Sequence, residues 1–548
     1  LVCTDAPVCP FSITLRKLNE GDVFWGVTSA ELDHLNCTAE SKPSVRQVAE
    51  FESTRSAIAG SRNISAAALG RVVQAQTGEE LRRHTLYRAR NIVNGELGTV
   101  ALENYQLIGP YLDAFTSNAS GTVTALERDG VGRFRRAFVM PSSQQVVLHS
   151  PRIFGVDATF MKNPGYNGQL LLLIGRDGKR RNYVVAFALV PKENLDNYEW
   201  FFRHVKAGES MEAILNDSKT VIFSDRDKGL ASAVQAELPA ANHLVCFAHL
   251  LRNLKANPRV PNLGPNVKLA WDMQKATSEV EYAAALQALA AVNAGAANYL
   301  CESDPNKWCV YHNNLRGTIM HGCSTSNFVE SENAKIMQLR NRLPFDCIAG
   351  MCENIAAERY GRHVEALELQ TKGQLISPKV VDIYEEQVRL AGAYAVRMTA
   401  PHVGIVTAAR GETAPRQRRV DLLARSCTCS FWQQRGIPCR HAIKLHREWR
   451  GQGPRPLDGT AWFSEGFAPC LAVSAVVKAY SMSIDVPLRE ELQADGVTLP
   501  APKVATAGRP KQKRVRSAGE GEAGRAGRPK RMFQCGTCGN IGHNSRSC

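Results

Sequence analysis

The sequence predicts an α/β protein whose central domain carries a helical insertion and is flanked by small zinc-binding domains. Three observations predict this organisation. Strand-like apolar runs alternate with amphipathic stretches in the middle of the chain, an Ala- and Leu-rich helical stretch follows them, and clusters of Cys and His with metal-ligand spacing lie on both sides. At 548 residues, the chain is long enough for several domains.

The central domain is predicted from seven consecutive segments. Three β-rich apolar runs, each closed by a turn signal, precede an amphipathic helix, a buried-looking strand, a second helix and a last strand. The order βββαβαβ is that of a ribonuclease-H-like fold. The segments are residues 153–160, 169–174, 183–190, 198–205, 220–224, 229–237 and 243–247.

The rest of the chain divides by composition and periodicity. Residues 41–150 carry apolar positions at helical spacing, and a turn at Gly78 fits either a DNA-binding helix-turn-helix or a plain helical bundle. The central domain spans 151–345, with a helical insertion at about 250–325 and a helix over 327–339 that returns to the core. The later segments are a helical region over 346–410, a zinc finger over 411–450, a helical or loop region over 451–500, a basic disordered linker over 501–534 and a last zinc-binding module over 535–548.

Nine of the sixteen cysteines, together with three histidines, fall into three clusters with the spacing of zinc ligands. Disulfides are the alternative, but they do not suit a long chain in which we find no secretory signal. The most specific cluster is Cys427-x-Cys429-x9-Cys439-x-His441. Two of its ligands lie on alternate residues of a predicted strand and two at the start of a helix, so all four can converge on one tetrahedral zinc ion.

The other two clusters lie near the ends of the sequence. In residues 1–40, a strand-like stretch separates two close pairs, which suits a small zinc finger, with unpaired thiols as the alternative. Residues 535–548 have the spacing of a zinc knuckle, a module that commonly contacts single-stranded nucleic acid, although some knuckles bind proteins. Up to three structural Zn²⁺ sites are therefore predicted. The ligands are Cys3, Cys9, His34 and Cys37 in the first module and Cys535, Cys538, His543 and Cys548 in the last.

Positive charge is concentrated in the linker before the last module. The formal net charge of the chain is +15, and residues 501–534 hold ten Lys and Arg against two Glu, a difference of +8. Such a segment favours a polyanionic partner, with an import signal or a solvated tail as alternatives. Two Gly-Arg-Pro-Lys repeats resemble the AT-hook, which lays Arg side chains into the narrow minor groove of A·T-rich DNA. The predicted DNA-binding residues are Arg509, Lys511, Arg528 and Lys530.

Two acidic residues lie within or directly after predicted core strands. Asp157 lies in the middle of an apolar strand, and Asp225 directly follows the strand over 220–224. Because a buried unpaired carboxylate is costly, such residues are paired, protonated or bound to a metal. If the two strands are neighbours, both carboxylates can share a cation.

A third acid is needed to hold two hard cations, and a helix packed on the sheet can supply it. Glu330, on the predicted helix over 327–339, is our choice, with Glu332 on a different face of that helix as the alternative. Three carboxylates holding two Mg²⁺ or Mn²⁺ ions suit phosphodiester hydrolysis and transesterification. Helix capping and surface salt bridges are the other interpretation of these acids.

Cys246-x2-His249 follows the last predicted core strand. Three interpretations remain open for it: half of a zinc site, a pair that positions groups beside the acids, or a buried thiol with a hydrogen-bonded histidine. Elsewhere, no run of about 18 apolar residues exists, so we expect no segment to span a bilayer.

Taken together, these residues resemble the transposases of Mutator-like elements, or MULEs, over nearly the whole length. Residues 427–441 are similar to the SWIM zinc finger of that family, the first forty residues resemble its WRKY/GCM-like zinc finger, and residues 535–548 resemble its CCHC zinc knuckle. Phe328 and Val329 stand before Glu330 where small residues are more usual. The other motifs that carry the resemblance are 155–160 around Asp157, 190–193 with Trp200 and Phe201, 224–230 around Asp225, Cys246-x2-His249 and 325–333 around Glu330.

The resemblance implies a DNA transposase in which Asp157, Asp225 and Glu330 form a catalytic DDE triad. Such an enzyme binds terminal inverted repeats, cuts DNA with two Mg²⁺ or Mn²⁺ ions and joins the ends to target DNA. We expect it to act in the nucleus, and as a homo-oligomer because two element ends must be brought together. The alternatives are a domesticated relative that regulates transcription by binding DNA without cutting it, and a protein-interaction module with no role at DNA.

Overall fold

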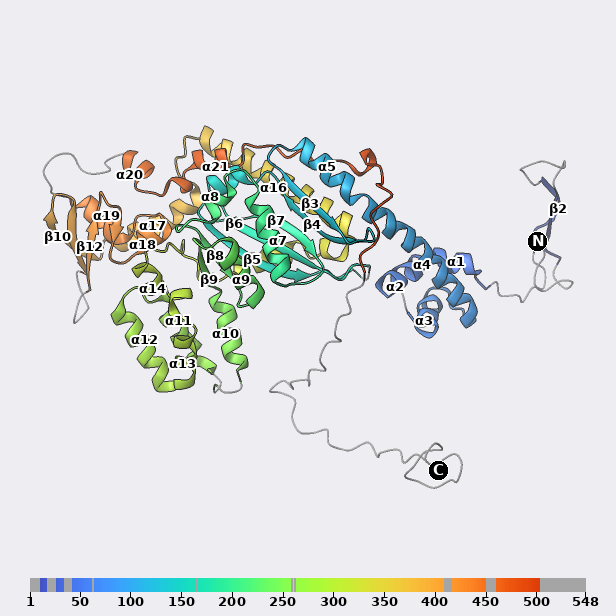
Figure 1. The fold of residues 1–548 in the computed structure, drawn as a ribbon, viewed down its shortest axis with the longest axis horizontal. Helices are drawn as coiled ribbons and strands as arrows, with labels where there is room; N and C mark the ends of the chain where they lie inside the picture. The colour runs from blue at the N-terminus through green and yellow to red at the C-terminus, as the bar shows by residue number, and fades with distance from the viewer. Residues whose placement is uncertain are drawn as a thin grey trace, which may run out of the picture. The chain divides into compact units, whose positions relative to one another are not determined.

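The computed structural model describes residues 10–16, 26–33, 42–61, 64–163, 165–257, 260, 263–408, 416–449 and 460–502 (Figure 1). Helices and strands are mixed throughout this part of the chain, as expected of an α/β protein. Of the helices in these ranges, none combines the length and the apolar character that crossing a membrane requires.

The first described elements are a two-stranded antiparallel pair, β1 (Ser12–Arg16) and β2 (Gly26–Glu31). Helices with a small apolar core of their own follow, centred on Val48, Leu69 and Val73. The predicted turn at Gly78 is present: Gly78 has φ +77° and ends α3, a left-handed conformation that favours glycine. The helices of this core are α1 (Val45–Glu50), α2 (Glu52–Gly60), α3 (Ala66–Thr77) and the first part of α4 (Arg83–Gln106), whereas α5 (Ile108–Asn118) follows and packs in a core of the central sheet.

A seven-stranded mixed sheet forms the centre, in the order β3-β4-β7-β6-β5-β8-β9 (Figure 1). β5, β6 and β7 are antiparallel neighbours, whereas β5, β8 and β9 run parallel. The strand predicted over 153–160 has those bounds, and the four other predicted strands differ by one or two residues at their ends. The bounds are β3 (Val123–Arg128), β4 (Phe134–Met140), β5 (Ile153–Phe160), β6 (Gln169–Arg176), β7 (Asn182–Val190), β8 (Val221–Ser224) and β9 (Asn242–Val245).

β3 and β4 correct the prediction that 41–150 is helical throughout. They pair as an antiparallel hairpin and extend the sheet beyond β7. Five consecutive residues of β4, from 136 to 140, are buried, because Phe138 and Met140 face one core and Ala137 and Val139 the other. A strand buried on both faces has no polar alternation, so its periodicity does not distinguish it from a helix. Asp129-Gly130 was the turn signal that marks the hairpin.

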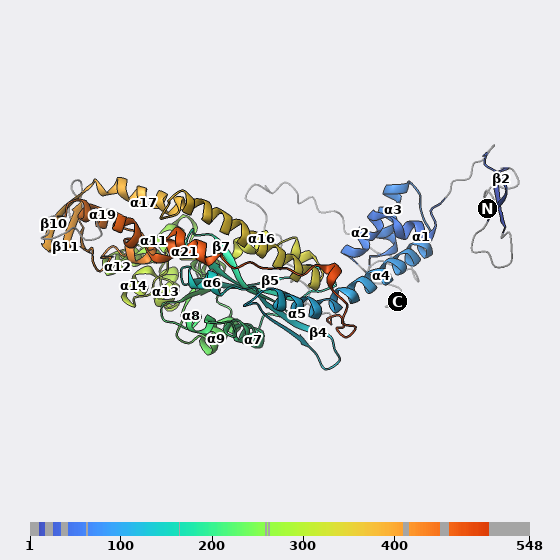
Figure 2. The same cartoon turned by 90° about the horizontal axis from the view of Figure 1, so that it is seen from above.

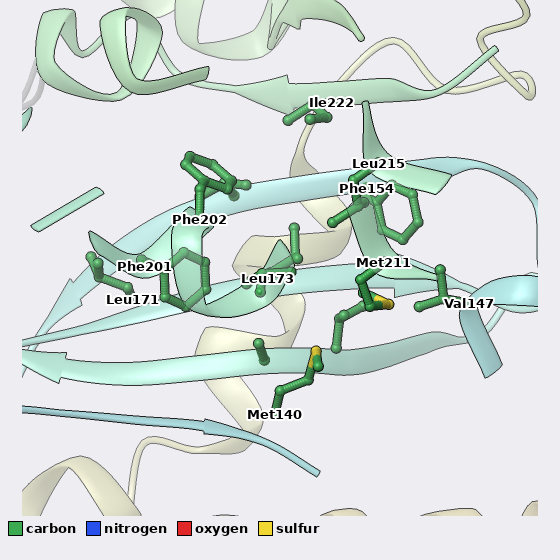
Figure 3. Close-up of a cluster of buried hydrophobic side chains, with 14 of the residues drawn as sticks. Met140, Val147, Phe154, Leu171, Leu173, Phe201, Phe202, Met211, Leu215 and Ile222 are labelled. Atoms are coloured by element: carbon green, nitrogen blue, oxygen red, sulfur yellow. The ribbon is translucent and has the colours of Figure 1, made fainter. Parts of the chain in front are cut away.

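Helices cover both faces of the sheet. Alternate residues of β6 enter different cores: Leu171 and Leu173 pack with α7 and α8, whereas Leu170 and Leu172 pack with α5 and α16. Figure 3 shows the first core, where Phe201 and Phe202 of α7 lie over the strands. Figure 2 shows α16 on the face opposite α7, α8 and α9. The helices on the first face are α6 (Gln144–Leu148), α7 (Leu195–Lys206), α8 (Met211–Leu215), α9 (Lys228–Glu237) and α21 (Val473–Ala479); on the second lie α5, α15 (Asn327–Lys335) and α16 (Pro344–Thr371), with the 3₁₀ turn η3 (Leu339–Asn341) between the last two.

Residues 247–315 are helical and stand between β9 and α15. Their helices share a separate core that includes Phe247, Leu289 and Trp308. One polar contact joins this region to the loop after β8, since Arg226 Nη1 donates to Tyr299 Oη at 3.0 Å. The elements are α10 (Phe247–Ala256), η1 (Gly264–Asn266), α11 (Val267–Lys275), α12 (Glu279–Val292), α13 (Ala294–Glu302), η2 (Pro305–Lys307) and α14 (Val310–Leu315).

The helical prediction for 346–410 holds only as far as residue 391. After α16 and α17 (Pro378–Ala391) come β10 (Tyr394–Ala400) and β11 (Val403–Ala408), an antiparallel hairpin that the sequence prediction missed. Both strands belong to the sheet of the later finger. The side chains that pack on them come from that finger and not from neighbouring residues of the chain. The remaining elements are β12 (Gln417–Asp421), β13 (Ser426–Cys427), α18 (Phe431–Arg435), α19 (Arg440–Arg447), α20 (Thr460–Glu465), η4 (Pro469–Leu471) and η5 (Arg489–Glu491).

Candidate functional site

Asp157 and Asp225 are brought together by two parallel strands. β5 and β8 are neighbours, and their register pairs Gly155 with Phe223. Two residues further along each strand, Asp157 and Asp225 therefore stand at the same level. Asp157 also accepts a hydrogen bond from Asn333 of α15, with 3.0 Å between Nδ2 and Oδ2.

The electrostatics of this pair are unbalanced. Burial, and then the neighbouring Asp225 carboxylate, raise the pKa of Asp157 to about 6. Within the described ranges, no Lys or Arg lies within 4.0 Å of either carboxylate, so no ion pair offsets the repulsion. Two close carboxylates without a cationic partner suit a divalent metal ion, which prefers oxygen ligands.

Glu193 is an additional acid of this cluster that our residue-by-residue analysis did not single out. It follows β7, and its carboxylate accepts a hydrogen bond from the Tyr198 hydroxyl. Burial raises its pKa, and the nearby Asp225 and Asp227 carboxylates raise it further. The signal was an acid shortly after a buried strand: Glu193 lies three residues beyond the end of β7, whereas Asp225 directly follows β8.

Asp227 has a structural role as a helix cap. Its Oδ1 accepts a hydrogen bond from Leu230 N at 2.9 Å at the start of α9. Its own backbone N donates to Asp225 Oδ1 at 2.9 Å. The capped start of α9 therefore fixes the orientation of the Asp225 carboxylate.

Glu330 lies on α15 and is held by two basic side chains of α10. Its Oε1 is 2.6 Å from Arg252 Nη2 and 3.4 Å from His249 Nε2. His249 also acts on Asp157, whose pKa it lowers against the dominant effect of burial. His249 thus stands close to both Asp157 and Glu330. In the described part of the chain, the carboxylate oxygens of Asp157, Asp225 and Glu330 do not come within 4.8 Å of one another as a set, so Glu330 stands apart from the two aspartates.

Glu332 points to a different neighbourhood. It is buried, and its carboxylate pairs with Lys335 Nζ at 2.7 Å. Lys335 in turn approaches Glu358 of α16 at 3.7 Å. Glu332 therefore belongs to the contact between α15 and α16, whereas Glu330 belongs to the contact with α10.

Cys246 connects β9, α10 and α15. Its buried Sγ accepts a hydrogen bond from Ser326 N at 3.2 Å, and Phe247 N donates to Ser324 O at 3.1 Å. Burial opposes ionisation of the thiol, yet its interactions with His249 and Ser326 lower its pKa overall. The same interaction with Cys246 raises the pKa of His249. These contacts fit two of the three interpretations: a buried thiol that interacts with a histidine, and a pair that positions the start of α15 and with it Glu330.

Gly155 sets the distance between β5 and α15. A Cβ at this position would lie 2.3 Å from Val329 Cγ2 and 2.7 Å from Phe328 Cζ, both buried. The large residues before Glu330 therefore occupy the space that glycine leaves free.

Gly155→Ala is expected to destabilise the fold by about 1–3 kcal/mol, because the added methyl overpacks this contact. Urea unfolding measures the change. Gly95→Ala is the control: Gly95 is exposed in α4 with no atom within 4 Å of an added Cβ. It should be neutral or stabilising by up to about 1 kcal/mol. Equal stability of the Gly155→Ala variant and wild type would show that α15 does not pack on β5 as described.

The predicted cluster at Cys427, Cys429, Cys439 and His441 is assembled. Its ligand atoms all lie within 4.8 Å of one another, and three of the four residues are buried. Cys427 ends β13, Cys439 caps α19 and His441 follows in the first turn of that helix. His441 is packed edge-on against Tyr394 of β10, with ring centroids 4.7 Å apart. Three thiols and one imidazole at this separation fit tetrahedral zinc.

Three sets of predicted residues lie outside the described ranges. They are the ligands of the first module (Cys3, Cys9, His34 and Cys37), the ligands of the last module (Cys535, Cys538, His543 and Cys548), and the AT-hook-like residues Arg509, Lys511, Arg528 and Lys530. These assignments stay predictions.

The fold and its two sites define an α/β protein with an acidic site on its central sheet and a Cys₃His finger. Residues 153–253 match the MULE transposase domain, and residues 417–445 match the SWIM zinc finger. The chain therefore contains both modules, which supports a place in the Mutator-like transposase family and supports zinc at the finger. A search of curated proteins found no match. The first match covers Asp157, Glu193, Asp225, Cys246 and His249, whereas Glu330 lies beyond it.

Proposed function

We propose that the chain is a DNA transposase of a Mutator-like element, which binds the terminal inverted repeats, cuts DNA and joins the ends to target DNA. The observation that carries the proposal is the pair Asp157 and Asp225, without an ion-pair partner, inside the segment that matches the MULE transposase domain. DNA recombination by a nuclease of this family needs such an acidic site.

The strand order supports a ribonuclease-H-like core. From β7 to β9, the sheet runs β7-β6-β5-β8-β9, with the first three strands antiparallel and the last two parallel to β5. In this order, the first strand in sequence is central and is joined on one side by the fourth. It is the arrangement that places an acid of the first strand beside an acid at the end of the fourth.

Asp157 and Asp225 would hold two Mg²⁺ or Mn²⁺ ions together with Glu330 as the third acid. Bound there, the cations would activate a water or a DNA 3′-hydroxyl and stabilise the departing oxygen. The carboxylates fit this role because their oxygens are the ligands that such cations prefer and because no basic side chain balances their negative charge. Asn333 orients Asp157 through its hydrogen bond, and Arg252 and His249 hold Glu330, which would have to leave that ion pair to serve as a metal ligand.

Binding and assembly complete the proposal. The first zinc finger, the helix-turn-helix around Gly78 and the basic linker would recognise the terminal repeats, and the knuckle would contact nucleic acid. A homo-oligomer would bring two element ends together, and the chain would act in the nucleus. Structural zinc at the SWIM finger fits the ligand set that the fold assembles.

Strand transfer in vitro tests the proposal. Purified zinc-loaded protein would receive Mg²⁺ or Mn²⁺ and DNA carrying the inverted repeats that flank its gene. We expect joined products from wild type and a loss of more than about 100-fold for Asp157→Asn and Asp225→Asn, because removing even an outer-shell partner of a metal ligand commonly costs 10- to 100-fold.

Two glutamine variants separate the candidates for the third acid. Glu330→Gln should lose strand transfer as severely as Asp157→Asn, whereas Glu332→Gln should keep most of it, because Glu332 faces α16. The reverse result would exchange their roles. Tight, sequence-specific DNA binding with no metal-dependent cleavage in wild type would instead establish the transcription regulator.

A further inference from the structure

A cluster of arginines surrounds a small cavity away from the acids. Arg176, at the end of β6, lies four residues beyond Leu172, the residue of β6 that pairs with Asp157. The arginines are therefore at a distance from Asp157 along the sheet. Arg176 and Arg180 line a cavity of about 30 Å³ together with His321 and with Arg435 of α18. We call this space the arginine cavity. It shares Cys323 and Arg435 with a neighbouring cavity of about 300 Å³.

The walls of the arginine cavity are fixed by hydrogen bonds. Arg176 Nη1 donates to Cys323 Sγ at 3.3 Å, and Arg176 Nη2 donates to Arg180 O at 2.7 Å. On the finger side, Gln434 receives a hydrogen bond from Met320 N at 2.7 Å and donates to Thr318 O at 2.9 Å. Residues of the central domain, of the loop over 318–323 and of the finger all line this cavity, and the Gln434 bonds hold the loop and the finger together beside it.

Positive charge in this cavity has no carboxylate to balance it. Among the described residues, no Asp or Glu lies within 4.0 Å of Arg176, Arg180 or Arg435, and Arg176 Nε is buried without a hydrogen-bond partner. Asp177 also lines the cavity, but its carboxylate accepts from Arg181 Nε and from the Tyr480 hydroxyl, each at 3.0 Å.

Three partly exposed guanidinium groups that share one cavity without a carboxylate partner repel one another, and a bound anion would offset that repulsion. Burial, together with the charges of Arg176 and Arg435, lowers the pKa of Arg180, which is the expected effect of such crowding. The same charges would repel a metal cation from Cys323 and His321. The balance of charge therefore selects an anionic ligand.

We propose that the arginine cavity binds a phosphate-class oxyanion, either a backbone phosphate of DNA or a free phosphate. Guanidinium groups match the geometry of phosphate oxygens, and several can bind one group at once. The arginine cavity by itself is on the scale of one or two water molecules, so the oxyanion would extend into the 300 Å³ space beside it, which Arg435 and Cys323 also line. A bound oxyanion would join the finger to the central sheet. This binding is separate from DNA cleavage.

Phosphate titration of the full-length, zinc-loaded protein tests the proposal directly. Calorimetry with inorganic phosphate should show saturable binding to wild type, at least tenfold weaker in Arg180→Gln and in Arg435→Gln. Arg397→Gln is the matched control, because Arg397 is exposed on β10 of the same finger and lies outside the cavity. It removes the same charge and should bind phosphate as wild type does.

Thermal unfolding shows whether a cavity variant loses phosphate binding because it is unfolded or because its binding site is changed. In phosphate-free buffer, both cavity variants should melt at or above the wild-type temperature, because each removes a repelling charge. In phosphate, wild type and Arg397→Gln should gain stability and the cavity variants should not. Cavity variants that still gain as much stability from phosphate as wild type would overturn the proposal.

The salt dependence of DNA binding distinguishes the two sources of phosphate. If the ligand is DNA, Arg435→Gln should reduce the slope of log K against log salt by about 0.9, the value for one lost phosphate contact. Loss of inorganic phosphate binding with an unchanged slope would identify a free phosphate. An unchanged slope and no saturable phosphate binding by wild type would refute the site. Neither measurement requires cleavage, so the outcome does not depend on whether the chain is an active transposase.

Discussion

Removal of zinc is expected to unfold the finger over residues 417–445 and to leave the seven-stranded sheet folded. Binding of structural zinc contributes about 10–16 kcal/mol in small fingers at neutral pH, which is comparable to the whole stability of an ordinary domain. Cys427, Cys439 and His441 are buried, so without an ion their polar atoms would crowd together with no compensating ligand. Hydrogen exchange before and after chelation measures the effect: amides of α19 should lose protection, and those of β6 and β7 should keep it.

A single substitution makes the same test without a chelator. Cys439→Ser should lower the zinc content by one equivalent and reproduce the loss of protection in α19. Cys301→Ser is the control, because Cys301 is exposed on α13 outside the ligand cluster. Unchanged zinc content in Cys439→Ser, or an α19 that stays protected without zinc, would contradict the assignment.

The finger also holds the loop over 318–323 of the central domain, so unfolding of the finger should increase hydrogen exchange in that loop. Gln434 bonds to residues 318 and 320, and Gly322 lies close to Arg435, whose Nε is 3.1 Å from the position of an added Cβ. The loop over 318–323 leads into the start of α15, which carries Glu330. Loss of zinc should therefore reduce the protection of that loop as well as of α19.

Local spacing was enough to predict the finger ligands and most of the core strands. Cys427 to His441 span fifteen residues, and a strand followed by a helix start brings them together without distant contacts. β5, β6 and β7 are long apolar runs closed by turns, so their sequence carries the strand signal. β10 was missed because its burial pattern is weak and its partner strands supply the packing.

The candidate site was predictable only where one strand fixes one residue. Asp157 interrupts one apolar strand and Asp225 directly follows another, and this local signal was sufficient to single them out. Glu193 joins them because the loop after β7 approaches the start of α9, where a Cβ on Gly229 would lie 2.9 Å from Leu195 N. The spacing of apolar residues along the sequence does not predict that this loop and this helix start lie close together. Which of Glu330 and Glu332 faces α10 likewise depends on tertiary packing, which the sequence does not show.

Asp157→Asn is expected to make the folded chain more stable at neutral pH while it abolishes the response to divalent cations. Burial and Asp225 raise the pKa of Asp157 to about 6 in the folded state, against 3.8 for the free group. An acid with a raised folded pKa destabilises the fold above that pKa. The penalty shrinks as the pH falls from about 6 towards 3.8 and is gone below 3.8, where the carboxyl is protonated in both states. Two pKa units correspond to at most about 3 kcal/mol.

Urea unfolding of zinc-loaded protein, in buffer without Mg²⁺ or Mn²⁺, measures this difference at each pH. Asp157→Asn should exceed wild type in stability by up to about 3 kcal/mol at pH 7.5, and the two should converge near pH 4. Comparing variant with wild type cancels the titration of the zinc ligands. Asp113→Asn, at an exposed position of α5, should show no such pH-dependent gain.

Added Mg²⁺ should stabilise wild type but not Asp157→Asn, because only the paired carboxylates give the cation a favourable site. A variant less stable than wild type at pH 7.5, with Mg²⁺ stabilising both equally, would mean that Asp157 serves the fold rather than a metal site.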